Sequence, residues 1–201
     1  MYIGLNFNPN SVRNKVYTST HKLLKEKKSA FLKRWFNFIV ETYPDEATRF
    51  LKYQKDRFAN PVGHALAQAL DRLFEEVVSG VDAQRAAPAL DQIIRIRAIQ
   101  NFSPSQAVAF VFFLKTVIRE ALEEDIKQSG IKEELLVIET RIDQLALLAF
   151  DQYLGCREKL YDLKANELHR QTYRLLQRAK IIGEPPASDL NSEEGNNRRK
   201  V

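Results

Sequence analysis

The chain has 201 residues, of which 44% are hydrophobic and 28% charged, and this balance is typical of a globular domain rather than a disordered chain. Its net charge of +5 comes from the first 34 residues, which hold eight Lys or Arg and one Glu; the remainder is close to neutral and lacks the basic surface of a nucleic-acid-binding domain. A single cysteine, Cys156, excludes an internal disulfide, and the longest apolar run, Ala107 to Leu114, is too short to cross a bilayer.

The N-terminal region divides into an arm and a helix. Residues 1–19 are rich in asparagine and contain Gly4 and Pro9, so we expect an irregular arm. Helical periodicity starts near His21 and continues to Pro44, which ends this helix and opens a short second helix through Leu51. The apolar face of the first helix consists of Leu24, Phe31, Trp35, Phe38 and Ile39.

Two cap-then-proline pairs, Asn60-Pro61 and Ser103-Pro104, predict the starts of later helices. Gly80 ends the first of these helices, and another helix follows, centred on the residues from Leu90 to Ile99. The helix after Ser103 is apolar on all sides in its first half. We therefore expect that half to lie at the centre of the core.

A long helix is predicted from Lys132 to Arg178, because apolar residues recur at helical spacing there without a proline. Its length of about 70 Å exceeds what a compact domain of this size covers. We therefore expect its apolar seam to contact a second copy or a partner protein. The seam consists of Leu135, Ile138, Ile142, Leu145 and Ala149, at near-heptad spacing.

The predicted fold class is all-α, because no segment shows the alternation of a strand. We expect a globin-like or bundle-type helical domain over residues 20–182, with a long C-terminal helix. Residues 183–201 contain two prolines and no apolar period, and we expect them to form a disordered tail.

No motif for catalysis or metal binding is present. His21, His64 and His169 lie on different predicted helices, and none has a second histidine one helical turn away. Cys156 lacks a resolving cysteine, and no Gly-rich phosphate loop or nucleophile motif occurs. We expect no catalytic residues, no metal site, no cofactor and no enzymatic activity.

Two arginines, Arg95 and Arg97, interrupt an isoleucine-rich helix, and Arg97 falls on its apolar side. A buried guanidinium requires a carboxylate, because an unpaired buried charge is costly. Asp143 on the long helix is a candidate partner. We favour a structural ion pair over an anion-binding pocket. The other carboxylates that could pair are Glu120, Glu139 and Asp151.

Four segments resemble the N-terminal domain of RsbRD-type proteins, the RsbT co-antagonist family of the bacterial stressosome. They are LKRWFNFIVETYP from Leu32, FANPVGHAL from Phe58, RIRAIQNFSPSQA from Arg95 and RIDQLALLAFDQYLGCREKLY from Arg141. The resemblance covers about residues 20–178, and RIRAIQNFSPSQ is its most specific segment. It implies a cytoplasmic, all-helical sensory or regulatory module, usually dimeric and followed by an output domain. No STAS output segment follows Arg178 in this sequence, so we do not expect the phosphorylation switch within it.

These patterns together predict a non-enzymatic sensory or regulatory domain in bacterial stress or metabolic signalling. We expect a cytoplasmic homodimer that binds signalling proteins, stressosome components among them, with no nucleic-acid partner and no integral membrane segment. An alternative is a small-molecule or haem-binding sensor, with a pocket lined by Trp35, Phe110, Phe113 and Tyr153. A further alternative is docking of the basic N-terminal arm to nucleic acid or an anionic membrane.

Overall fold

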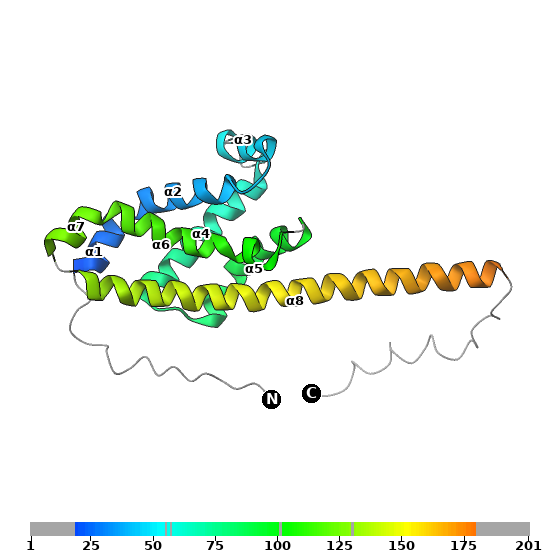
Figure 1. The fold of residues 1–201 in the computed structure, drawn as a ribbon. Helices are drawn as coiled ribbons and strands as arrows, with labels where there is room; N and C mark the ends of the chain where they lie inside the picture. The colour runs from blue at the N-terminus through cyan, green and yellow to red at the C-terminus, as the bar shows by residue number, and fades with distance from the viewer. Residues whose placement is uncertain (1–18, 55, 57, 101, 130, 180–201) are drawn as a thin grey trace, which may run out of the picture. The chain divides into compact units, whose positions relative to one another are not determined.

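The structure, a computed structural model, describes residues 19–179 apart from residues 55, 57, 101 and 130. The chain divides into two units, Met1–Arg157 and Glu158–Val201, and each is described by itself. The described residues form eight helices and no strand, which confirms the all-α prediction (Figure 1). The expected arm and tail lie outside the described residues, except that Ser19 begins the first helix.

The helices follow one another with short connections. They are α1 (Ser19–Glu26), α2 (Lys28–Val40), α3 (Asp45–Tyr53), α4 (Pro61–Ser79), α5 (Ala83–Ile99), α6 (Pro104–Ala121), α7 (Glu123–Ser129) and α8 (Lys132–Arg178). The long C-terminal helix thus has the bounds that the sequence predicted.

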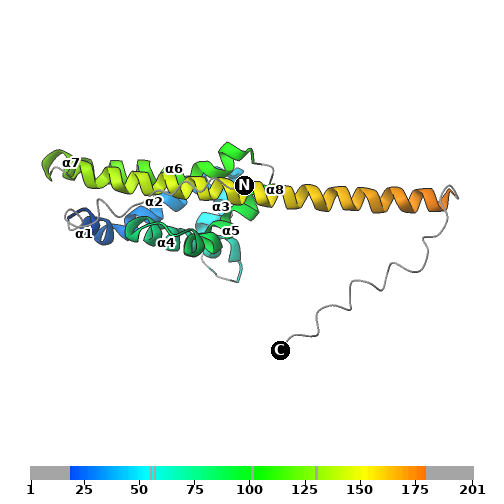
Figure 2. The same cartoon turned by 90° about the horizontal axis from the view of Figure 1, so that it is seen from below.

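The core of the first unit is built around α2, which lies between α4 and α6 (Figure 2). Phe31 of α2 contacts Phe74 of α4, with ring centroids 5.9 Å apart. On the side of α6, the indole Nε1 of Trp35 donates a hydrogen bond to the carbonyl oxygen of Phe110 at 2.6 Å. Both Trp35 and Phe110 are fully buried, so one face of the first half of α6 lies in the core, whereas Phe112 on its other face is 43% exposed and corrects the prediction that this half is buried on all sides.

The cap signals act at the predicted positions. Asn60 Oδ1 accepts from the backbone N–H of Gly63 at 2.8 Å and begins α4. Ser103 and Gln106 form a reciprocal capping box at the start of α6. Gly80 ends α4 with φ of 117°, a backbone conformation that side chains disfavour.

One predicted helix is divided in the structure. The periodicity from His21 predicted one helix up to Pro44, but the chain forms α1 and α2 with a break at Lys27. The Lys27 Nζ atom bonds to the carbonyl oxygen of Ala121 at 3.2 Å and to Asp125 at 2.8 Å. These contacts with the α6–α7 region lie far away in sequence, so helical periodicity does not detect them.

The first part of α8, up to Arg157, packs on the other helices of its unit through side chains. Arg141 Nη1 donates to the last carbonyls of α4, those of Val77 at 3.0 Å and Val78 at 2.6 Å. Gln152 bonds to Asp91 of α5 at 3.0 Å, and the Tyr153 hydroxyl donates to the carbonyl of Phe102 at 2.7 Å. The chain's own helices therefore cover one side of this segment.

This packing corrects the predicted contact seam. The five side chains assigned to a dimer or partner helix are buried within the chain itself. The seam is covered because α4, α5 and α6 lie against it, and the heptad-like spacing alone does not distinguish such intramolecular packing from a dimer. The five residues are Leu135, Ile138, Ile142, Leu145 and Ala149.

The second unit is described for residues 158–179, which continue α8 to Arg178. Nearly all of its described side chains are exposed, including Tyr161, Leu163, Leu168 and Leu175. This segment has no apolar core of its own among the described residues.

None of the helices in the described part of the chain combines the length and the apolar character needed to span a membrane.

Candidate functional site

Arg97 occupies a site enclosed by aromatic rings at the end of α5. Its side chain is fully buried, and its guanidinium carbon lies 4.7 Å from the ring centroid of Phe102, 5.3 Å from that of Tyr43 and 5.5 Å from that of Phe110. Cation–π attraction of this kind contributes about 1–2 kcal/mol when the cation is desolvated. Aromatic rings therefore stabilise the guanidinium charge of Arg97, in place of the carboxylate that the sequence predicted.

Two hydrogen bonds complete the Arg97 site. Nη1 donates to the carbonyl oxygen of Gln106 at 3.0 Å, and Nη2 donates to the hydroxyl of Thr42 at 2.8 Å. Nε has no partner. Burial lowers the pKa of Arg97, while interaction with the Tyr43 side chain opposes that shift. Burial also raises the pKa of Tyr43, and the positive charge of Arg97 opposes this.

The predicted ion pair involving Arg95, Arg97 and Asp143 is corrected by the structure, which does not bring the three together. Arg95 is exposed and pairs with Asp91 one turn earlier on α5, with Nε and Oδ2 2.7 Å apart. Asp143 pairs with Lys115 of α6 at 2.6 Å. Two of the other proposed carboxylates pair with other arginines: Glu139 with Arg119 and Glu120 with Arg34.

The partners of Arg97 come from elements far apart in sequence. Tyr43 follows α2, Phe102 precedes α6, and Phe110 lies within α6. The position of Arg97 among apolar residues indicated a special site, but no spacing rule could identify aromatic partners that tertiary packing supplies. The arrangement fixes the α5–α6 turn against the end of α2.

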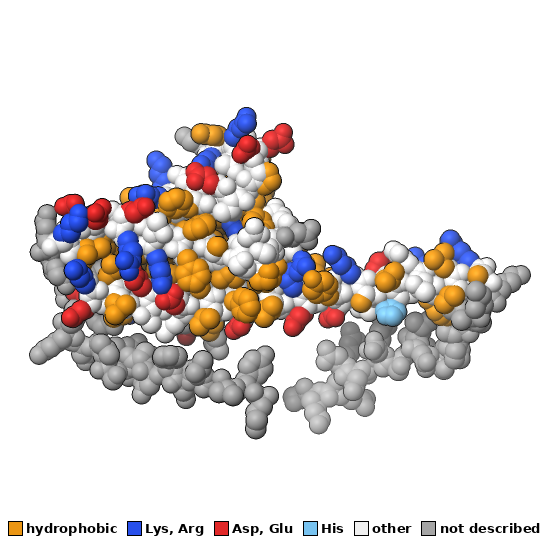
Figure 3. All heavy atoms as spheres, in the orientation of Figure 1, with side chains coloured by type: hydrophobic (Ala, Val, Ile, Leu, Met, Phe, Trp, Pro, Cys, Tyr) orange, Lys and Arg blue, Asp and Glu red, His pale blue; other side chains and the backbone are white. Residues whose placement is uncertain are grey.

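A second feature is the set of exposed apolar side chains on α6 and α8. In the first unit Phe112, Leu147, Phe150 and Leu154 are exposed to solvent, and Figure 3 shows hydrophobic side chains gathered over this part of the surface. In the second unit Tyr161, Leu168 and Leu175 are exposed. These residues differ from the buried seam that the sequence pointed to.

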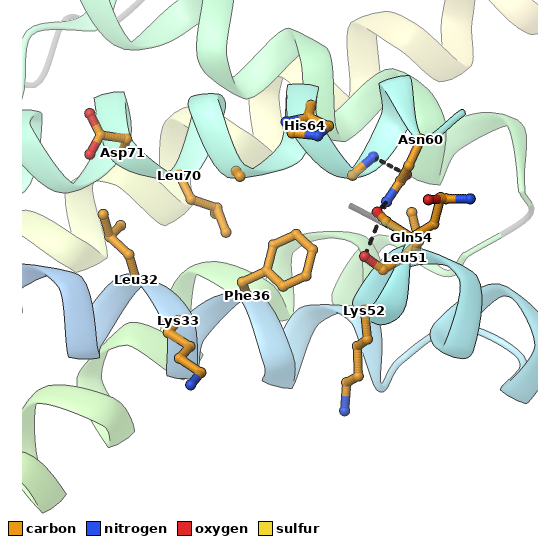
Figure 4. A pocket seen from close by; sticks show the side chains of 12 residues that line it. Leu32, Lys33, Phe36, Leu51, Lys52, Gln54, Asn60, His64, Leu70 and Asp71 are labelled. Atoms are coloured by element: carbon orange, nitrogen blue, oxygen red, sulfur yellow. Dashed lines mark hydrogen bonds between the residues drawn. The ribbon is translucent and has the colours of Figure 1, made fainter. Parts of the chain in front are cut away.

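A third feature is a pocket of about 470 Å³ between α2, α3 and α4 (Figure 4). Apolar side chains of α2 and α4 line its interior, and lysines stand at its edge. Its lining residues are Leu32, Lys33, Phe36, Leu51, Lys52, Gln54, Asn60, Gly63, His64, Ala67, Leu70 and Asp71. None of the four aromatic residues proposed for a pocket lines it: Trp35, Phe110 and Tyr153 are buried in the core, and Phe113 packs against Phe38.

His21 lies on α1, His64 on α4, and Cys156 and His169 on α8. His64 is partly buried at the pocket, whereas His169 is exposed in the second unit. Cys156 is partly exposed on α8. Within residues 19–179, the four undescribed positions aside, no group of three His, Cys, Asp or Glu side chains is arranged to hold a metal ion.

Comparison with known proteins gives one family and one relative. The family model described as "RsbT co-antagonist protein rsbRD N-terminal domain" matches residues 29–168, a span that holds both the Arg97 site and the pocket. An uncharacterized protein of Archaeoglobus fulgidus is 24% identical over 105 residues, which are 51% of this chain and 66% of the relative's length. No solved structure matches the chain.

Proposed function

Because the chain belongs to the RsbT co-antagonist rsbRD N-terminal domain family, as four segments of its sequence predicted, we propose that it is a non-enzymatic regulatory domain of stressosome-type signalling. It acts in the cytoplasm through protein contacts. Two copies pair along the exposed apolar positions of α8, and the pair binds signalling proteins through other surfaces.

A seven-residue repeat of exposed apolar side chains is the observation that carries the proposal. In the second unit the repeat consists of Tyr161, Leu168 and Leu175, which are 58%, 64% and 64% exposed. Leu147 and Leu154 of the first unit continue the same sequence spacing and are also exposed. Side chains seven residues apart recur at the seam between two coiled helices, so a second helix is the occupant that this spacing fits.

The composition of the repeat predicts a weak pair. The positions three residues after Leu154, Tyr161 and Leu168 are Arg157, Lys164 and Gln171, where a stable coiled coil has apolar residues. In these three heptads only one of the two seam positions is therefore apolar, whereas Phe150 follows Leu147 at the same spacing. Burying each leucine contributes about 2 kcal/mol, and part of this gain offsets the lost freedom of the two chains on association. We therefore expect a dimer with a dissociation constant on the order of micromolar.

Sedimentation of the full chain tests the pairing. We expect a monomer–dimer equilibrium that Leu168→Glu weakens about tenfold or more, because a carboxylate enters the apolar seam. Leu163→Glu is the matched control: Leu163 is 66% exposed on the same segment but lies about 140° around the helix from Leu168. A wild-type monomer at tens of micromolar, or equal weakening by both variants, would contradict the proposal.

The partner-binding surface is proposed to include the exposed aromatic side chains around α3. Phe50, Tyr53 and Phe58 are exposed, and Phe58 is 95% accessible. Exposed aromatic residues are typical of the centres of protein interfaces. The variant Tyr53→Ser, Phe58→Ser should remain dimeric but lose proteins that co-purify with the wild type from its native cell. Retention of all of these proteins would exclude this surface.

A second candidate function, a small-molecule or haem sensor, is favoured by the pocket between α2, α3 and α4. Haem binding can be tested directly, because His64 lines that pocket and a histidine can ligate haem iron. If haem binds, purified protein mixed with haem should show the Soret band of bound haem, and His64→Ala should abolish that band. A spectrum identical to that of free haem would exclude the haem sensor.

A further inference from the structure

The pocket between α2, α3 and α4 has the dimensions of a small-ligand site. Its volume of about 470 Å³ lies within the range of roughly 300–1,000 Å³ that such sites occupy. Figure 4 shows Leu32 and Phe36 pointing from α2 toward α4, and Leu70 pointing from α4 toward α2. A ligand with an apolar body would therefore meet apolar carbon on both sides.

One wall of the pocket is fixed before any ligand binds. Asn60 is buried, and its Nδ2 donates to the carbonyl of Leu51 at 3.2 Å and to that of Gln54 at 3.0 Å. Its Oδ1 accepts from the N–H of Gly63, where an added Cβ would clash with the Asn60 side chain. Asn60 thus joins the end of α3 to the start of α4, so little ordering cost remains for binding.

Among the charged residues that line the pocket, two lysines, Lys33 and Lys52, outnumber one carboxylate, Asp71. Lys33 is exposed at the α2 edge and makes no hydrogen bond or ion pair with the described residues. Asp71, the acidic lining residue, is paired at 2.8 Å with Lys28, which Glu75 shares at 2.6 Å. Lys52 bonds to Glu41 at 2.7 Å. Lys33 is therefore the lining cation available to an anionic ligand. Figure 4 shows Lys33 and Lys52 extending away from the space between α2 and α4, so an anion beside Lys33 lies at the rim of the pocket and not in its interior.

We propose that this pocket binds a small amphipathic carboxylate, whose hydrocarbon body lies against Phe36 and Ala67 and whose carboxylate lies beside Lys33. Apolar walls alone would accept neutral or cationic molecules as well; the lysine at the edge selects the anion. The site stands apart from the dimer proposed above, because none of its lining residues belongs to α8.

Calorimetric titration of the full chain with octanoate tests the ligand class. Three comparison probes separate the contributions: octanol has the same body without charge, octyltrimethylammonium has the opposite charge, and acetate has the charge without the body. We expect saturable octanoate binding, at least about threefold weaker octanol binding, and none of the other two. Octanol or the cation binding as tightly as octanoate would overturn the proposal, as would absence of octanoate binding.

Two pairs of variants locate the site. Ala67→Phe places a ring in the pocket and should weaken octanoate binding about tenfold or more, whereas Gln68→Phe adds the same ring to the neighbouring exposed position, which does not line the pocket. Lys33→Glu should weaken binding about three- to fivefold, while Lys25→Glu, on the exposed surface of α1, should not. Binding that is the same in all four variants would place octanoate elsewhere and overturn the assignment.

Discussion

The two parts of α8 belong to one continuous helix but differ in what surrounds them. Between Lys132 and Arg157, α8 buries Leu145 and Ala149 among the other helices of the first unit. Between Glu158 and Arg178, leucines such as Leu168 and Leu175 are exposed. Apolar residues at helical spacing therefore indicate that a face will be covered, but they do not indicate whether the same chain covers it.

The largest expected difference between the two parts concerns buried leucine. Leu145→Ala should lower the free energy of unfolding by about 2–5 kcal/mol, because it removes a fully buried side chain and leaves a cavity. Leu168→Ala should change it by less than about 0.5 kcal/mol in dilute, monomeric protein. Urea denaturation of both variants measures this; similar losses would show that the second part is also buried within the monomer.

The covered part of α8 packs beside the Arg97 site, since Tyr153 bonds to the carbonyl of Phe102. Arg97→Met should lower the free energy of unfolding by about 2 kcal/mol: two charge-assisted hydrogen bonds are lost, and relief of the buried charge offsets part of that loss. Chemical denaturation measures the change. A loss above about 4 kcal/mol would indicate that a carboxylate partner had been left unpaired, contrary to the aromatic site described.

A matched pair of arginines sharpens the comparison. Arg141→Met removes two hydrogen bonds to the final carbonyls of α4 and should cost about 1–2 kcal/mol. Arg174→Met, on the exposed second part, should be neutral within about 0.5 kcal/mol. Thermal unfolding of the two variants provides the measurement, and equal midpoints would show that the α8–α4 contact adds no stability.

A tyrosine in each part gives the smallest expected difference. Tyr153→Phe loses the 2.7 Å hydrogen bond to Phe102 and should cost about 1 kcal/mol. The hydroxyl of Tyr173 has no hydrogen-bond partner among the described residues, so Tyr173→Phe should leave unfolding unchanged. Denaturation curves at one protein concentration below dimerisation compare them. A costly Tyr173→Phe and a neutral Tyr153→Phe would reverse the assignment of the two parts.

Local signals in the sequence predicted much of the fold. Asn60-Pro61, Gly80 and Ser103-Pro104 mark helix ends through bonds between near neighbours, so the bounds of α4 and α6 follow from short motifs. The break at Lys27 was missed because no proline or glycine marks it; the Lys27 side chain contacts Ala121 and Asp125, which lie far along the chain.

The candidate sites were less accessible to sequence reasoning. Arg97 stood out among apolar residues, but its rings come from three separate elements, and the expected carboxylate is absent among the described residues around it. The pocket was missed because Phe36 and Ala67 only become neighbours of one cavity once α2 and α4 pack. Both features depend on tertiary structure, which residue spacing does not encode.

Hydrogen–deuterium exchange along α8, measured from submicromolar to hundreds of micromolar protein, tests the central claim most directly. We predict that amides from Glu158 to Arg178 exchange more slowly as concentration rises, because a second copy covers them, whereas amides from Leu135 to Tyr153 exchange equally slowly throughout. Fast exchange of the second part at every concentration, or concentration-dependent protection of the first part, would contradict the account.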